Sequence, residues 1–115
     1  MPPDRDRATV LDIVAAARLV LQFVRGLDYA GFLADRKTQS AVIHQLLVIG
    51  EAAKRLSPEF KSAHAGIPWQ SIARMRDKMI HHYDAVDIRE VWKAIEADIP
   101  KLLAAVEPLV PPEGC

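Results

Sequence analysis

An amphipathic segment rich in ionisable side chains spans residues 69–83 and reads WQSIARMRDKMIHHY. At about 100° per residue, its apolar side chains share one stripe of a helix; they are Trp69, Ile72, Ala73, Met79, Ile80 and Tyr83. Arg76 falls in the middle of this stripe, where a packed helix normally carries an apolar residue. A buried guanidinium needs a carboxylate partner or a path to water. The segment therefore predicts a core-facing helix in which Arg76 is either a structurally paired arginine or part of a functional site.

The helical phase separates the polar residues of this segment. His81 lies five positions after Arg76, which is about 140° around an ideal helix, whereas Tyr83 lies nearly on the same line as Arg76. Arg74 shares the face of His81. If Arg76 and His81 are to meet at one ligand, the arginine stem must wrap around the helix, the helix must distort, or a second subunit must complete the site.

The rest of the chain also has helical spacing, because its apolar residues recur every three to four positions and glycine is sparse. We expect an all-α fold, an antiparallel helical bundle with short accessory helices. The expected helices cover residues 6–25, 29–33, 36–56, 58–64, 68–85 and 88–107. Gly26 is a suitable stop for the first helix, and Pro100 should kink the last helix or restart it after Asp98. Side chains that can cap helix starts stand before four of these helices; they are Asp28, Asp35, Ser57 and Asp87.

Gly50 and Glu51 stand in the middle of the long predicted helix 36–56. A mid-helix glycine costs about 1 kcal/mol relative to alanine and commonly permits another backbone to approach. Glu51 has two interpretations. It is spaced to pair with Arg55 at i and i+4, or it is the partner of an arginine in the segment 69–83 or a residue that orients His81.

Length and charge restrict the class of protein. The 115 residues indicate one domain, which we assign to residues 1–107, followed by a short Pro-rich C-terminal tail, residues 108–115. The 15 basic and 15 acidic residues balance, so any nucleic-acid contact must be local. Cys115 is the sole cysteine, which excludes an intrachain disulfide. No signal peptide or membrane span is apparent, so we expect a cytoplasmic protein without a membrane partner.

A family resemblance rests on Arg76-x4-His81-x-Tyr83 and its flanking motifs, and it covers about residues 32–103. The flanking motifs are Ile67-Pro68-Trp69, Ile49-Gly50-Glu51-Ala52 and Val91-Trp92. Together they resemble the HepT-like toxins of the HEPN superfamily. The resemblance implies a homodimeric, metal-independent endoribonuclease of a type VII-like toxin–antitoxin system. It also implies an MntA-like nucleotidyltransferase antitoxin that adds AMP to Tyr83, giving O-AMP-tyrosine.

The residue types suit the chemistry that the resemblance implies. A neutral His81 can accept a proton from the ribose 2′-hydroxyl, and Arg76 can stabilise charge on the phosphate. The hydroxyl of Tyr83 can bind phosphate or accept AMP, and adenylylation should silence the enzyme by adding charge and bulk. Asp77 stands where such toxins often carry Asn, and its extra negative charge should weaken RNA binding. Secondary candidates are Arg74, Glu51, Asp77 and His82.

We expect neither a metal nor another cofactor. His81 and His82 are adjacent and point about 100° apart on a helix, whereas paired helical ligands usually stand at i and i+4. Asp77 and His81 have that spacing, but two ligands do not complete a site. An alternative function is a non-catalytic nucleotide- or RNA-binding partner of a nucleotidyltransferase, in which Arg76 pairs with Glu51 and the histidines lie on the surface. A further alternative is a helical dimer without nucleotide function.

Overall fold

The computed structural model describes the backbone of residues 3–81 and 86–110, and the side chains of residues 5–79 and 86–110. These residues form helices without any strand, which confirms the all-α prediction. The α-helices are α1 Pro3–Phe23, α2 Tyr29–Leu33, α3 Arg36–Arg55, α4 Pro58–Ala63, α5 Trp69–His81, α6 Ile88–Lys93 and α7 Ile99–Val106. A π-helical segment, Ala94–Asp98, joins α6 to α7, and a 3₁₀ turn, Glu107–Leu109, follows α7.

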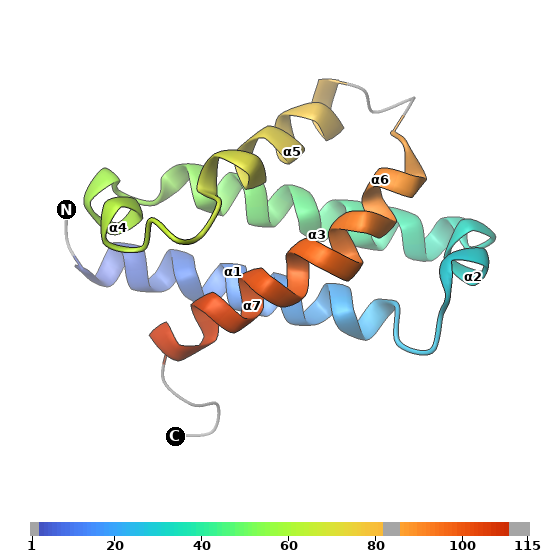
Figure 1. The fold of residues 1–115 in the computed structure, drawn as a ribbon, viewed down its shortest axis with the longest axis horizontal. Coiled ribbons are helices and arrows are strands. Elements are labelled where there is room, and N and C mark those ends of the chain that lie inside the picture. Colours follow the sequence, from blue (N-terminus) through green and yellow to red (C-terminus); the bar gives the residue numbers. More distant parts are fainter. Residues whose placement is uncertain (1–2, 82–85, 111–115) are drawn as a thin grey trace.

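The bundle is built on α1 and α3, which lie side by side and run in opposite directions (Figure 1). α5 packs on α3, and α7 packs on α1. The short helix α2 contacts α3 and α6 near the turn between α1 and α3.

The predicted apolar stripes form the core. On α1, Val10, Val14 and Ala17 are buried, while Leu21 is half-buried. All four predicted positions of α3 are buried; they are Val42, Leu46, Ile49 and Ala53. The last helices contribute four further buried side chains at helical spacing, namely Ile95, Ile99, Leu102 and Val106. The helical period thus identified the core-facing sides correctly.

Helix starts are fixed by the four predicted caps. The side chains of Asp28, Asp35, Ser57 and Asp87 each accept a backbone hydrogen bond from the first turn that follows. The predicted start of the first helix at Asp6 is wrong, because α1 already begins at Pro3, and proline is well suited to a first turn. The helix also ends earlier than Arg25, and Gly26 adopts a left-handed conformation at φ +80° in the turn after it.

Pro100 restarts the last helix after Asp98, as predicted. A proline has no N–H to donate to the preceding turn, and its ring displaces the carbonyl there. The wider π-helical turn Ala94–Asp98 lies directly before it. The 3₁₀ turn then carries Leu109 and Val110 back onto the core, so the first residues of the predicted tail 108–115 pack on the domain. The Arg18 guanidinium donates to Glu107 at 2.7 Å and holds this turn against α1. The predicted end of the motif helix near residue 85 lies outside the described residues.

Asp6 connects the first turns of α1 to the junction between α3 and α4. Its carboxylate is buried, and it accepts hydrogen bonds from the Ser57 N–H at 3.0 Å and from the Ser57 hydroxyl at 2.7 Å. The Ser57 oxygen in turn caps α4 through the Phe60 N–H. Burial is the largest influence on the pKa of Asp6 and raises it, but the hydrogen bonds from Ser57 and the nearby positive charge together outweigh burial, so the pKa of Asp6 lies below its ordinary value.

We expect Asp6→Ala to lower the free energy of unfolding by about 1–3 kcal/mol at pH 7, because two buried donors of Ser57 lose their acceptor. Asp12→Ala on the same helix is the control, since that carboxylate is 60% exposed and pairs only loosely with Arg55 at 3.7 Å. The Asp6 pKa is lower in the folded protein than in the unfolded chain, where it is about 3.9. The contribution of its charge is therefore complete above that value and is lost as the pH falls through the folded-state pKa.

Urea denaturation at pH 7 and at several pH values below about 4 measures the free energy of unfolding of the wild type and the two variants. The stability gap between the wild type and Asp6→Ala should narrow over the acidic range. An equal effect of Asp6→Ala and Asp12→Ala at pH 7 would contradict the assigned role of Asp6.

Candidate functional site

Gly50 sets the distance between α3 and α5. A Cβ atom added to Gly50 would overlap the Cβ of Arg76 and lie 2.7 Å from its Cγ and 3.4 Å from its Cα. The predicted close approach of another backbone is therefore confirmed, and the approaching residue is Arg76 itself. The absent side chain of Gly50 is what allows the stem of an arginine to occupy the packed face of α5.

Arg76 is held by carboxylates from two helices. Its Nη2 lies 2.7 Å from Oε2 of Glu51 on α3, and its Nη1 lies 3.2 Å from Oδ1 of Asp77, the next residue on α5. Its side chain is 25% exposed, while that of Glu51 is 47% exposed. The guanidinium thus passes out of the packed face and reaches solvent beside its partners.

The second interpretation of Glu51 is the one that the structure supports, since Glu51 pairs with Arg76. Arg55 reaches Asp12 on α1 instead, at 3.7 Å. The cause lies in the packing of the helices, because the α3–α5 contact at Gly50 brings the half-buried Arg76 within reach of Glu51. The pairing of Glu51 with Arg76 is also expected if Arg76 has only a structural role. The pair therefore fixes the position of the guanidinium but does not decide its function.

Lys54 extends the charged cluster and was not among the site residues predicted from the sequence. Its Nζ lies 2.6 Å from Oδ1 of Asp77, the same oxygen that Arg76 contacts. Hydrogen bonds from Lys54 and then from Arg76 hold the pKa of Asp77 below its ordinary value. The available signal was the helical spacing of Glu51 and Lys54, which stand at i and i+3 on α3.

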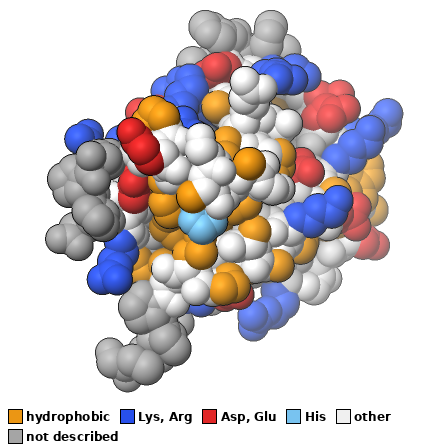
Figure 2. All heavy atoms as spheres, turned by 60° about the vertical axis from the view of Figure 1, so that its left-hand side comes forward, with side chains coloured by type: hydrophobic (Ala, Val, Ile, Leu, Met, Phe, Trp, Pro, Cys, Tyr) orange, Lys and Arg blue, Asp and Glu red, His pale blue; other side chains and the backbone are white. Residues whose placement is uncertain are grey.

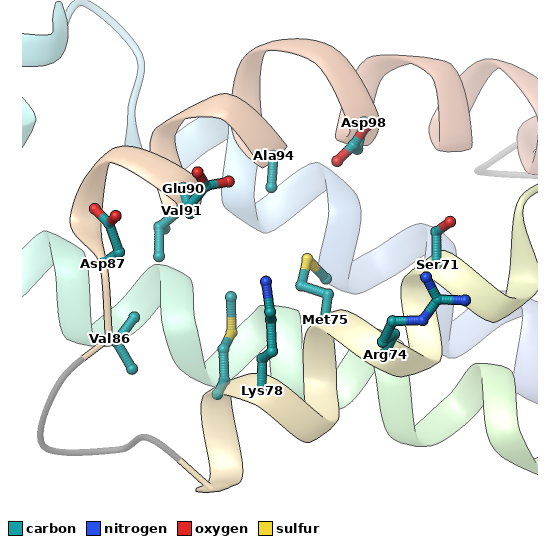
Figure 3. A pocket seen from close by; sticks show the side chains of 11 residues that line it. Ser71, Arg74, Met75, Lys78, Val86, Asp87, Glu90, Val91, Ala94 and Asp98 are labelled. Atoms are coloured by element: carbon teal, nitrogen blue, oxygen red, sulfur yellow. The ribbon is translucent and has the colours of Figure 1, made fainter.

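An open cleft of about 540 Å³ lies on another side of α5, between this helix and α6 with the π-helical segment (Figure 3). Arg74 and Lys78 project from α5 along one wall, and Asp87, Glu90 and Asp98 stand on the other wall (Figure 3). Apolar side chains also line the cleft; they are Met75, Met79, Val86, Val91 and Ala94.

Arg74 and Arg76 serve different surfaces, as their helical phase predicted. Arg76 faces α3, whereas Arg74 lines the cleft. Within the described part of the chain, neither Arg74 nor Lys78 forms an ion pair. The cleft therefore has two cations on α5 that form no ion pair with the described residues, and three carboxylates on the opposite wall.

Charge is mixed elsewhere on the surface. Figure 2 shows one face of the molecule, on which Lys and Arg side chains alternate with Asp and Glu around exposed hydrophobic groups. No large area of a single charge is visible on that face. This agrees with the zero formal net charge and limits any strong anion binding to local groups of cations.

The remaining predicted residues are only partly placed. His81 is the last residue of α5, and its side chain lies outside the described part of the protein. His82 and Tyr83 lie outside the described residues altogether. The structure therefore brings together Arg76, Glu51 and Asp77 and separates Arg74 from them. That Arg76 and His81 meet at one ligand stays a prediction.

Metal binding and membrane insertion would each leave a recognisable pattern of side chains or helices. No three His, Cys, Asp or Glu residues of residues 5–79 and 86–110 are grouped as metal ligands would be. Among the helices that the structure describes, none combines the length and the apolar character needed to cross a membrane.

The fold and the charged cluster define a small helical-bundle protein with an arginine fixed at a helix–helix contact. The sequence model of the family described as "Ribonuclease HepT-like" matches residues 13–109. The chain belongs to the HepT-like ribonuclease family. No solved structure matches it significantly.

Named relatives cover almost the whole chain. A protein of Thermococcus cleftensis named "Probable ribonuclease HepT" is 48% identical over 98 residues, which are 85% of this chain and 89% of the relative. A protein of Methanocaldococcus jannaschii with a provisional RNase name is 36% identical over 110 residues, covering 96% and 91% of the two chains. A third relative, from Caldanaerobacter subterraneus subsp. tengcongensis and also provisionally named an RNase, is 36% identical over 101 residues, covering 88% and 90%.

Proposed function

We propose that this protein is a metal-independent endoribonuclease that acts in the cytoplasm as the toxin of a type VII-like toxin–antitoxin system. The observation that carries the proposal is the guanidinium of Arg76, which Glu51 fixes at the contact between α3 and α5. A planar, permanently charged fork in a fixed position suits a phosphate whose negative charge grows during the reaction. Membership of the family supports the same activity.

In the proposed reaction, the ribose 2′-oxygen attacks the neighbouring phosphorus while His81 accepts the hydroxyl proton. The bond from phosphorus to the 5′-oxygen breaks, and that oxygen takes a proton from a water molecule, which recovers a proton from the protonated His81. Arg76 donates hydrogen bonds to the non-bridging oxygens as charge accumulates on them. Arg74, at the edge of the cleft, would bind a neighbouring part of the RNA backbone.

Tyr83 is the proposed control point. An AMP group transferred to its hydroxyl by an MntA-like nucleotidyltransferase antitoxin would place a phosphate and an adenosine two residues from His81. The added negative charge would repel RNA, and the added bulk would fill the space that RNA needs.

A homodimer is part of the proposal because one α5 helix places Arg76 and His81 about 140° apart. Two α5 helices related by a two-fold axis can present Arg76 of one subunit and the partner's His81 to one cleft. A monomeric variant that remains folded and cleaves RNA as fast as the wild type would contradict this arrangement.

The test compares the protein alone with the protein after incubation with the nucleotidyltransferase encoded beside it and ATP. We expect the untreated protein to cleave RNA in excess EDTA, and the treated protein to gain the mass of one or more AMP groups at Tyr83 and to lose cleavage. A correctly folded protein that neither cleaves RNA nor gains mass would refute the proposal.

A second candidate function is a non-catalytic RNA- or nucleotide-binding partner of a nucleotidyltransferase. It is favoured by the pairing of Arg76 with two carboxylates, because this pairing neutralises the proposed catalytic cation in the free protein. The cleavage assay together with a measurement of RNA binding separates the two functions, since a binding partner would retain RNA without cutting it.

A further inference from the structure

One carboxylate oxygen joins two cations from different helices at the edge of the α3–α5 contact. Asp77 Oδ1 lies 2.6 Å from Lys54 Nζ and 3.2 Å from Arg76 Nη1. Glu51 contacts the other terminal nitrogen of Arg76 and leaves Nη1 to Asp77. Lys54 and Nη1 of Arg76 therefore converge on a single point, which a carboxylate oxygen occupies in the free protein.

The position of this oxygen is open to solvent. The side chains of Lys54 and Asp77 are 38% and 44% exposed. Ion pairs at such exposure contribute little to stability and compete with ions in solution. Arg76 differs because it is the least exposed of the three and is also held by Glu51. A dissolved anion can therefore replace Asp77 without displacing Arg76 from Glu51.

We infer that Lys54 and Arg76 form a binding site for an RNA phosphate, and that Asp77 occupies this site as a built-in competing anion until RNA displaces it. Lys54 is then a phosphate-binding residue in addition to those predicted from the sequence, and Asp77 sets how tightly RNA binds. The inference rests on the proposed ribonuclease function and names the part of the site that holds the RNA backbone.

Two phosphate oxygens can accept hydrogen bonds from the ammonium group and the guanidinium together, as a bridging anion requires. Displaced from the two cations, the Asp77 carboxylate remains beside the bound phosphate and repels it. Removing the charge of Asp77 should therefore strengthen RNA binding, whereas removing the charge of Lys54 should weaken it. These opposite signs distinguish a binding site from an ion pair that only supports the fold.

The experiment measures the affinity for a single-stranded RNA whose 2′-hydroxyls are all methylated, so that it cannot be cleaved. Fluorescence anisotropy over a series of KCl concentrations gives the dissociation constant and its salt dependence. We compare Lys54→Gln with Lys37→Gln, which removes an exposed lysine near the other end of α3. Asp77→Asn is compared with Asp12→Asn, which removes another exposed carboxylate paired with an arginine across two helices.

We expect Lys54→Gln to weaken binding and to reduce the slope of log K against log salt by about 0.7, the loss of one phosphate contact on a single strand. Lys37→Gln should leave the slope unchanged. Asp77→Asn should bind more tightly than the wild type, and Asp12→Asn should not. The inference is overturned if Lys54→Gln matches Lys37→Gln, or if Asp77→Asn binds no more tightly than Asp12→Asn.

Two further measurements separate this inference from the proposed function. Cleavage of unmodified RNA by the wild type, together with unaltered binding by Lys54→Gln, would retain the ribonuclease and refute the phosphate site. If the wild type binds the methylated RNA but does not cleave unmodified RNA, weaker binding by Lys54→Gln would retain the phosphate site and refute the ribonuclease. A wild type that does not bind the methylated RNA would refute the phosphate site.

Discussion

Gly50→Ala is expected to lower the free energy of unfolding by about 2 kcal/mol and to move α5 away from α3. The alanine Cβ would overlap the Cβ of Arg76, an atom that cannot move by a change of rotamer. Overpacking of this kind costs about 1–3 kcal/mol, occasionally more. The higher helix propensity of alanine offsets about 1 kcal/mol of that cost. The rigid contact atom puts the overpacking cost at the upper end, so the substitution should be destabilising.

Gly66→Ala is the matched control for this prediction. A Cβ at Gly66 would meet nothing within 4 Å, and Gly66 is not among the positive-φ glycines of the described residues. Its substitution should be neutral or should stabilise the protein by about 0.4–1 kcal/mol through the unfolded chain. Thermal and urea unfolding of both variants provide the comparison. Equal stability of the two variants would show that α3 and α5 are not held together at Gly50.

The rate of RNA cleavage should also respond to the displacement of α5 in Gly50→Ala. Moving α5 shifts Arg76 relative to Glu51, and a fixed guanidinium loses catalytic value when its position changes by about 1 Å. We therefore expect Gly50→Ala to cleave RNA more slowly than Gly66→Ala at a temperature where both are folded.

The local features of this fold were predictable from sequence because they depend on neighbours in the chain. The caps at Asp28 and Asp35 each bond a residue three positions ahead, so their spacing is visible in the sequence. The core-facing sides follow in the same way from helical periodicity. The sequence also indicated that Gly50 permits a close approach.

The features that were not predicted depend on which helix faces meet. Asp6 and Ser57 are 51 residues apart in the chain, and nothing local marks them as partners. Lys54 was not among the predicted site residues, because only the α3–α5 contact at Gly50 places Asp77 beside it. The choice of Arg76 over Arg55 as the partner of Glu51 has the same origin. Periodicity gives the direction of a side chain on its own helix, but the crossing of two helices decides which side chains it meets.

Arg76→Ala should reduce RNA cleavage by about 100-fold or more, mainly in kcat, because it removes a donor that acts as charge develops on the phosphate. His81→Ala should reduce cleavage by about 100- to 10,000-fold through loss of the base. Arg74→Ala should mainly raise KM, since Arg74 lines the cleft and contacts neither Glu51 nor Asp77. Steady-state kinetics on one fluorogenic RNA measure all three variants.

Folding does not explain the loss expected for Arg76→Ala. The Glu51 carboxylate left behind is 47% exposed and can be hydrated, so the variant should keep the helical content of the wild type by circular dichroism. Arg76→Lys retains the charge without the planar fork, and it should recover only part of the rate.

The decisive comparison is between the two arginines, because their positions make opposite predictions. If Arg76→Ala still cleaves RNA rapidly and Arg74→Ala cleaves it slowly, the reaction takes place in the open cleft between α5 and α6. There Arg74 shares the helical phase of His81, and the angular separation that calls for a second subunit would disappear. If Arg76→Ala cleaves RNA slowly, the reaction takes place on the α3 side of α5, where Glu51 fixes the arginine. The catalytic histidine must then reach this side from elsewhere, as in a dimeric site. The relative rates of these two single substitutions therefore test the catalytic residue and the need for a dimeric site together.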